Sequence, residues 1–326
     1  MRALLARLGG ALLLFWLVVS ITFLLVRLAP GDAAALLVPP DASQVDAARI
    51  RARLGLDAPI AVQYARWSIS VVSGDLGTSF ATGRPVTTVL GESLPISLAL
   101  GGASLLLSFL IGTTVGMVQA VRRGRALDRA LTVVTTTLYA APSFWLALTL
   151  IALFTYGAAR WNFPAWSRLP AFGVRDPGAE LEGVGAWLDI ARHAILPIVT
   201  LTVVGAAGVS RYARTALADT LGADHVRTAR AKGAGPVRTI VGGALPVALP
   251  PLVILLALTL PGVIAGSVFV ESIFAWPGMG RAMLTAIAAR DYPVVMGATI
   301  VYAALVIAAN LAADLALPLL DPRRRR

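Results

Sequence analysis

Residues 219–250 read DTLGADHVRTARAKGAGPVRTIVGGALPVALP, and they interrupt long apolar runs with basic residues, glycines and prolines. Residues 223–232 favour a helix, Gly233 is suited to end it, and Pro236 is suited to begin the next one. The sequence therefore predicts a short helix isolated between two flexible points. Such a hydrophilic helix is a candidate docking surface for a soluble partner.

The composition around this stretch is that of an integral membrane protein. Of 326 residues, 57% are hydrophobic and 14% are charged, whereas a soluble domain has about 25% charged residues. The net charge of +11 does not predict nucleic-acid binding, because the arginines lie beside apolar runs without interleaved aromatic residues. Cysteine is absent, which excludes disulfides and thiolate metal sites.

Six apolar runs are long enough to cross a membrane as helices. They predict an all-α integral membrane protein with six transmembrane helices, a larger extracytoplasmic loop after the first, and a cytoplasmic coupling-helix loop. Six crossings place both termini on one side, and the terminal arginines predict that this side is the cytoplasm. The expected runs are residues 8–26, 93–121, 130–159, 193–210, a fifth that begins near residue 248, and 292–313.

Four regions follow from these runs. They are an N-terminal transmembrane helix at 1–30, an extracytoplasmic loop at 31–92, a five-helix core at 93–320 with its cytoplasmic loop at 211–247, and a basic tail at 321–326. The first run also resembles a signal peptide, but it exceeds the 7–15 residues of a signal core, so a retained helix is preferred.

Several local features are also predicted. Residues 45–54 and 60–72 are expected to form short helices, and glycines and an aspartate at 73–80 favour a turn. Pro142 is expected to kink the third transmembrane helix. The fourth is rich in glycine and alanine at 205–208, which allows close approach of another helix.

Counting crossings places residues 211–245 on the cytoplasmic side, where basic residues outnumber Asp219 and Asp224. The sign of this charge agrees with the positive-inside rule. One alternative is a polar connector that its arginines hold against anionic lipid, each contributing about 1 kcal/mol.

The stretch also resembles the EAA loop in permease subunits of ATP-binding-cassette (ABC) importers. That signature is Glu-Ala-Ala, three residues, Gly, nine residues, then Ile-x-Leu-Pro. Here the second Ala, the Gly and the Leu-Pro match literally, while RTARAKG is similar to the form in dipeptide and oligopeptide importers. The residues that align with it are Arg227-Thr228-Ala229, Gly233 and Gly243-Ala244-Leu245-Pro246.

Three other segments are similar to the same subfamily, so that the resemblance covers essentially the whole chain. They are GDLGTS at 74–79, ESIFAWPGMG and RDYPVVMG within 271–297, and NLAADLALPLLDPR at 310–323.

The resemblance implies half of a translocation pathway in a bacterial-type inner membrane. Its expected partners are a second homologous permease, two ATP-binding subunits or domains, membrane lipid and an extracytoplasmic solute-binding protein. Dipeptides or oligopeptides are the expected cargo, and nickel chelates, glutathione or oligosaccharides are alternatives. The residues expected to couple to the ATPase are Arg227, Thr228, Ala229, Arg230, Lys232, Gly233, Leu245 and Pro246; those lining the substrate path are not assigned.

The chain is not expected to be an enzyme. Its one lysine, Lys232, follows Ala231, so the Gly-Lys-Ser/Thr sequence of a Walker A phosphate loop is absent. No cofactor, metal ion or catalytic residue is expected in this chain; ATP and magnesium would bind the partner ATPases. An ion-coupled secondary transporter is the rival, because Pro142 and Pro261 could break helices near the membrane midplane. His193 and His225 are expected on opposite sides, which disfavours a membrane enzyme.

Overall fold

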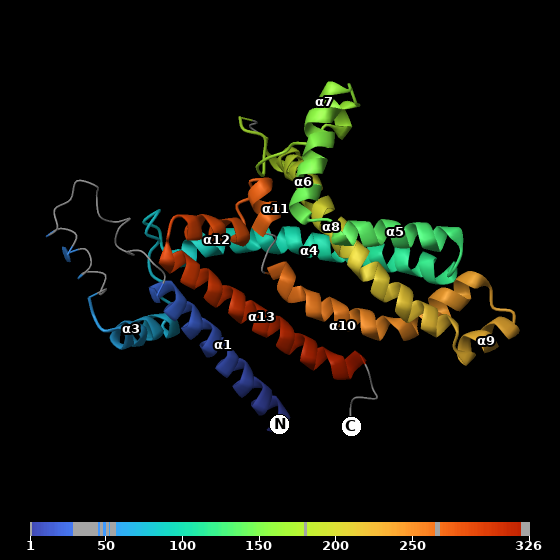
Figure 1. The fold of residues 1–326 in the computed structure, drawn as a ribbon, viewed down its shortest axis with the longest axis horizontal. Coiled ribbons are helices and arrows are strands. Elements are labelled where there is room, and N and C mark those ends of the chain that lie inside the picture. Colours follow the sequence, from blue (N-terminus) through green and yellow to red (C-terminus); the bar gives the residue numbers. More distant parts are fainter. Residues whose placement is uncertain are drawn as a thin grey trace. The chain divides into compact units, whose positions relative to one another are not determined.

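The computed structural model describes residues 2–28, 45, 48–49, 52, 57–178, 181–264 and 268–320. Across these ranges the chain is helical, and its only β pairing is an isolated bridge between Thr78 and Pro85. Six helices in the described ranges are long and apolar enough to cross a membrane, which confirms the predicted fold class (Figure 1). They are Arg7–Leu28, Val86–Val121, Ser143–Arg160, Gly183–Leu221, Arg238–Leu260 and Tyr292–Ala312. The predicted helix at 45–54 falls largely outside the described residues, and the tail at 321–326 entirely so.

The chain forms two compact units, and the first contains Met1–Ile96 with Pro277–Ala308. Helix α1 (Arg2–Leu28) and the predicted helix α3 (Ile60–Val72) meet in this unit. The buried Phe23 ring lies 5.4 Å from the Tyr64 ring and 5.0 Å from the Trp67 ring, centroid to centroid. Ser20 Oγ and the Tyr64 hydroxyl are 2.6 Å apart. An aromatic cluster therefore holds α3 against α1.

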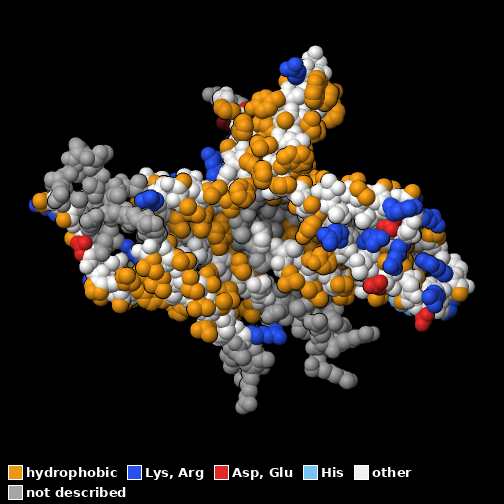
Figure 2. All heavy atoms as spheres, in the orientation of Figure 1, with side chains coloured by type: hydrophobic (Ala, Val, Ile, Leu, Met, Phe, Trp, Pro, Cys, Tyr) orange, Lys and Arg blue, Asp and Glu red, His pale blue; other side chains and the backbone are white. Residues whose placement is uncertain are grey.

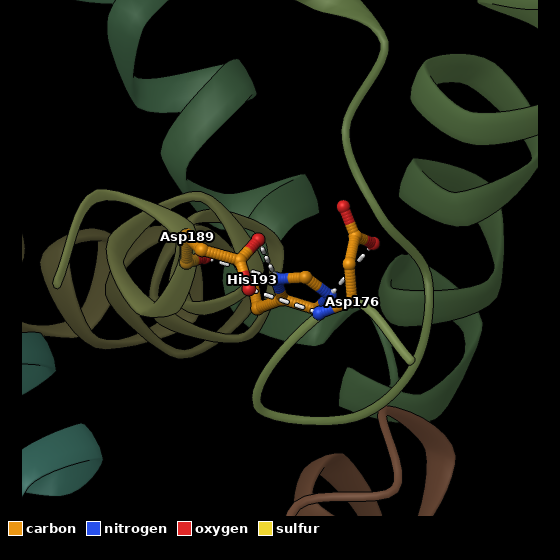
Figure 3. Close-up of side chains that lie close together, drawn as sticks. All are labelled: Asp176, Asp189 and His193. Carbon is orange, nitrogen blue, oxygen red and sulfur yellow. Dashed lines mark hydrogen bonds and ion pairs between the residues drawn. The ribbon is translucent and has the colours of Figure 1, made fainter. Parts of the chain in front are cut away.

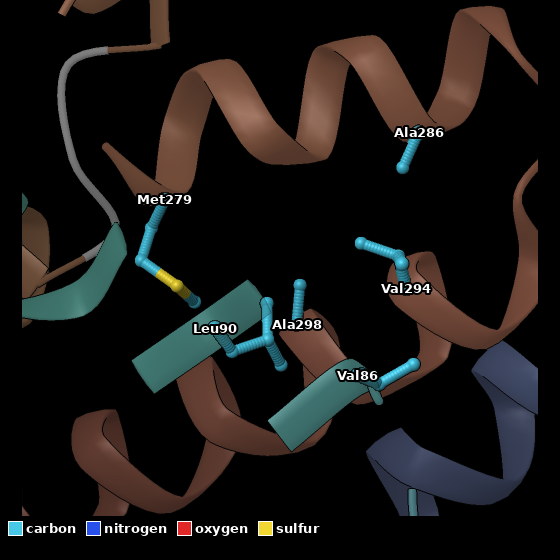
Figure 4. Packing of buried hydrophobic residues seen from close by; sticks show 6 residues of the cluster. All are labelled: Val86, Leu90, Met279, Ala286, Val294 and Ala298. Carbon is cyan, nitrogen blue, oxygen red and sulfur yellow. The ribbon is translucent and has the colours of Figure 1, made fainter. Parts of the chain in front are cut away.

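The core of this first unit lies between α12 (Met279–Ala288) and the beginnings of α4 (Val86–Val121) and α13 (Tyr292–Leu320). Asp291 precedes α13, and its carboxylate accepts hydrogen bonds from Phe80 N at 3.0 Å and Ala81 N at 3.2 Å. These bonds hold the turn before α4 against the core. Figure 4 shows the buried side chains of this core, Val86, Leu90, Met279, Ala286, Val294 and Ala298.

The second unit contains Ser97–Trp276 with Ala309–Arg326, and α8 (Gly183–Leu221) is its central helix. It contacts α5 (Ala126–Ala140), α6 (Ser143–Ile151), α10 (Leu245–Ile264) and α11 (Val268–Ile273). In the apolar 18-residue stretch of α8, 56% is buried, whereas at most 33% of the corresponding stretch is buried in the other described spans. These four helices therefore pack against α8.

Small residues allow α4 and α8 to pack closely. A Cβ atom on Gly112 would lie 2.7 Å from Ala206 O, and one on Gly116 would lie 2.6 Å from Ser210 O. The close approach predicted for the Gly- and Ala-rich segment of α8 is seen at Gly205, where a Cβ would meet the Ser108 side chain of α4. Gly112 and Gly116 form a GxxxG pattern, which permits backbone contact between membrane helices.

Two spans differ from their predicted form around a proline. Helix α4 begins at Val86 rather than 93, and Pro95 lies inside it rather than in its first turn. Pro95 removes one intrahelical hydrogen bond, and the helix continues through it. At Pro142 the chain breaks rather than kinks: Ala141 and Pro142 are extended, with ψ of 130° and 133°. The residue before proline disfavours the helical region, so α6 leaves α5 at a steep angle (Figure 1).

The remaining span after the break passes through the π-helical turn η1 (Ala152–Gly157) and α7 (Ala158–Arg160). A short 3₁₀ turn, η2 (Ala165–Ser167), follows in the loop that leads to α8.

Other helices extend past their apolar centres. Helix α8 runs from Gly183 to Leu221 rather than over 193–210, since its polar ends contain no strong helix breaker before Gly222. The predicted start near 248 is wrong, because helical structure begins at Pro236, two residues before the fifth span, and continues through the π-helical η3 (Arg238–Ala244) into α10. Helix α13 begins at the predicted residue 292 and continues past 313 to Leu320. Much of the predicted loop at 211–247 is therefore helical.

Candidate functional site

The short helix predicted in residues 223–232 is α9 (Asp224–Ala231), which lies beyond the end of α8 (Figure 1). Among its residues only Val226 is buried, with 0% of its surface exposed. Val226 packs in a cluster with Ala120 of α4, Leu217 of α8, and Ala244 and Ala248 of the fifth span. A single apolar side chain thus anchors α9 to the ends of three membrane-spanning segments.

Gly233 ends α9 as predicted. Its φ of +83° is a left-handed conformation that favours glycine. Gly233 N donates to Arg230 O at 2.9 Å, and Ala234 N donates to Ala229 O at 3.1 Å. This pair of bonds is a Schellman motif, which satisfies carbonyl groups at the helix end. No atom lies within 4 Å of a Cβ built on Gly233, so the glycine is required here by its φ and not by crowding within this chain.

The remaining predicted coupling residues divide between two elements. On and just after α9, Ala229 is half-buried, and the others leave their side chains exposed: Arg227, Thr228, Arg230 and Lys232. Leu245 and Pro246 instead lie in the first turn of α10. Leu245 packs against the Val226 cluster, while Pro246 is exposed. The structure therefore brings these residues to one end of the second unit, and their role in coupling stays a prediction.

This end of the second unit is strongly basic. Figure 2 shows Lys and Arg side chains gathered around α9 and the α4–α5 connection. Within α9, an Arg227 nitrogen lies 3.7 Å from an Asp224 carboxylate oxygen, and both side chains are largely exposed. An exposed ion pair of this kind contributes little stability. The basic surface remains available to a partner with complementary charge.

An ion pair between α5 and α8, in which the aspartate is buried, was not predicted. Arg214 of α8 donates from Nε to Asp128 Oδ1 at 2.8 Å and from Nη2 to Oδ2 at 2.9 Å. Gly124 N also donates to Oδ2 at 2.9 Å, and Asp128 is 2% exposed. The hydrogen bonds from Arg214 lower the pKa of Asp128 to about 2. The sequence held one signal for this ion pair, because Asp128 is the one acidic residue in the basic stretch at 122–129.

Comparisons with known proteins identify the family. A family model described as "Binding-protein-dependent transport system inner membrane component" matches residues 112–326, and a model of the N-terminal part of such membrane components matches residues 1–101. The chain belongs to this permease family. The resemblance seen in the EAA-like loop is thereby confirmed.

Relatives of this permease are similar over nearly their whole length. The "Probable D,D-dipeptide transport system permease protein DdpB" of Escherichia coli is 39% identical, across 97% of this chain and 95% of that protein. The "Oligopeptide transport system permease protein AppB" of Bacillus subtilis is 35% identical, across 93% and 92%. The "Di/tripeptide transport system permease protein DppB" of Pseudomonas aeruginosa is 35% identical, across 98% and 97%. All three relatives are named as permease proteins of peptide transport systems.

A solved structure supports the fold. A chain of the MetNI methionine ABC transporter, in an inward-facing conformation, matches with a TM-score of 0.52 at 21% identity. The match covers 72% of this permease and 97% of that chain. The fold of this permease is therefore similar to that of the transporter chain.

Proposed function

We propose that this permease is one transmembrane subunit of an ATP-driven importer for dipeptides or oligopeptides. A second homologous permease completes the pathway, and two ATP-binding subunits or domains supply the energy. A solute-binding protein delivers cargo from outside, with residues 31–92 as its docking region. Relatives named for D,D-dipeptide, oligopeptide and di/tripeptide transport support the substrate class.

The observation that carries the coupling role is the attachment of α9. Its polar face is exposed, while Val226 packs against α4, α8 and the fifth span. An ATPase that binds the exposed face and moves it would apply the displacement to the ends of these spans through Val226. ATP and magnesium would bind in the ATPases. This assignment requires that the ATPase has a groove that accepts α9. It also requires that the permease has two arrangements, which make different contacts with the ATPase.

The proposed orientation places α9 and both termini in the cytoplasm. An even number of spans returns the chain to its starting side. The arginines of the α4–α5 connection and the basic residues around α9 then lie where the positive-inside rule expects them. The loop between α7 and α8 lies on the outer side in this arrangement.

Reconstitution of the complete importer tests this function. The permease, its neighbouring permease, the ATPases and the binding protein are placed in liposomes, and uptake of labelled peptides is measured with ATP on the ATPase side. Nickel chelates, glutathione and oligosaccharides serve as competitors that report substrate class. Uptake driven by an imposed proton or sodium gradient without ATPases would instead establish the secondary-transporter alternative.

Substitution of Gly233 tests the coupling site separately. Gly233→Trp places a bulky group at the end of α9 and should leave ATP hydrolysis present while uptake is strongly reduced. Gly178→Trp is the matched control, because Gly178 has a φ of +85° and no atom within 4 Å of a built Cβ, but lies in the loop before α8. Normal uptake by Gly233→Trp would refute the role of this position.

A further inference from the structure

A histidine and two aspartates converge outside the coupling site. Asp189 and His193 lie one turn apart on α8, and Asp176 comes from the loop before that helix (Figure 3). One oxygen of each carboxylate and one ring nitrogen lie within 4.8 Å of one another. His193 Nε2 is 3.6 Å from Asp176 Oδ1, and His193 Nδ1 is 3.3 Å from Asp189 Oδ1. The imidazole ring is therefore placed between two carboxylates.

Two of the three groups are removed from water. His193 is 3% exposed and Asp189 is 6% exposed, whereas Asp176 remains open to solvent. Asp189 Oδ2 accepts a hydrogen bond from Asp176 N at 2.9 Å. Within the described part of the chain, neither carboxylate pairs with a Lys or Arg. The cluster thus carries negative charge beside a buried imidazole, and burial of unbalanced charge is unfavourable.

The histidine contacts leave a nitrogen lone pair directed at the cluster. His193 Nδ1 lies 2.9 Å from the Asp189 main-chain oxygen, which can only accept, so Nδ1 is the donor. In the neutral ring Nε2 then has a lone pair, and it faces Asp176 at a distance beyond hydrogen-bonding range. Fixing Nδ1–H on a backbone carbonyl is the arrangement that prepares a histidine as a metal ligand through Nε2.

We propose that Asp176, Asp189 and His193 bind a divalent transition-metal cation, with zinc as the best match. Imidazole nitrogen and carboxylate oxygen are zinc ligands at about 2.0–2.2 Å, which places tetrahedral ligands about 3.3 Å apart. The 3.6 Å between His193 Nε2 and Asp176 Oδ1 is close to that separation. One Asp189 carboxylate oxygen lies within 4.8 Å of the other two ligand atoms, and rotation of that side chain away from Nδ1 would bring it into the same set. The bound cation would balance both carboxylates and fasten the loop containing Asp176 to α8.

Metal content of the assembled importer tests the site. The complex is purified with a tag that contains no histidine, supplied with zinc, and dialysed against metal-free buffer before elemental analysis. Wild type should retain one zinc per permease above the partners' background, whereas His193→Gln and Asp176→Asn should lose it or bind it at least about tenfold more weakly. His225→Gln is the matched control, because it removes the other histidine, on α9, and should leave the zinc content unchanged.

Binding and stability measurements complete the test. Cobalt should give the visible absorption of a tetrahedral nitrogen–oxygen site in wild type and His225→Gln, but not in His193→Gln. Added zinc should raise the unfolding temperature of the complex only where both His193 and Asp176 are present. The same zinc content in wild type and in both site variants would overturn the proposal. So would stabilisation through His193 that depends on pH and not on zinc, since that result describes a protonated histidine paired with aspartate.

Discussion

The contact between α4 and α8 gives a sharp prediction at Gly116. A Cβ at this position would lie 2.6 Å from both Ala213 Cβ and Ser210 O, and 2.8 Å from Arg214 N. Two of these are main-chain atoms, which cannot rotate away as a flexible side chain can. Gly116→Ala must therefore separate the two helices locally.

The size of the effect follows from these distances. Ordinary contact begins at 3.4 Å, so the helices must move apart by roughly 0.8 Å. Overpacking of this kind costs about 1–3 kcal/mol. Alanine is also the better helix former, by about 1 kcal/mol, and that gain offsets part of the cost. Gly102→Ala is the matched control in the same helix, because no atom lies within 4 Å of its built Cβ.

Equilibrium unfolding of the assembled importer in detergent measures the difference. Gly102→Ala should be as stable as wild type or slightly more so, and Gly116→Ala should be less stable than Gly102→Ala by about 1–3 kcal/mol. Because both variants make the same chemical change in α4, helix propensity largely cancels in the comparison. Equal stability of the two would show that Gly116 does not set the separation of α4 and α8.

Three further predictions concern α9, the ion pair between α5 and α8, and the orientation. Val226→Ala should weaken the anchor of α9, so that hydrogen–deuterium exchange of its amides becomes faster while exchange in α3 is unchanged. The pKa of Asp128 is about 2, below the ordinary 3.8, so its ionised form stabilises the fold above about pH 4 and this stability is lost as the pH falls towards 2. Asp128→Asn should remove this pH dependence from acid unfolding. An unchanged acid-unfolding profile would refute the prediction. In the cysteine-free chain, Thr228→Cys should react with an impermeant maleimide only from the cytoplasmic side and Gly178→Cys only from outside, and labelling from the reverse sides would invert the topology.

Much of the structure around α9 could be predicted because short-range rules determine it. The glycine at 233 ends α9, and Pro236 begins the next helix, as local backbone preferences require. Span limits were less predictable, since hydropathy detects the part of a helix that lies in lipid, whereas α8 continues at both ends with polar residues. The break before Pro142 also exceeded the expected kink, because the preceding residue adopted an extended conformation as well.

The interactions that sequence reasoning missed join residues far apart in the chain. Asp128 and Arg214 are 86 positions apart, and only folding of α5 against α8 brings them together. The sequence shows that Asp189 and His193 are one helical turn apart. No local sequence pattern places Asp176 beside them. The GxxxG pattern at Gly112 and Gly116 is visible in the sequence, but the sequence does not show which helix packs against it.

These long-range contacts give α8 a role that its sequence alone did not indicate. Near its α9 end, Gly116 of α4 packs against the backbone at Arg214, and the Arg214 side chain binds Asp128 of α5. One turn further along, Leu217 joins the cluster that buries Val226. A displacement of α9 therefore meets a close-packed, ion-paired segment rather than a flexible connector. Under the proposed mechanism this stiffness is what carries the movement to α4 and α5 together.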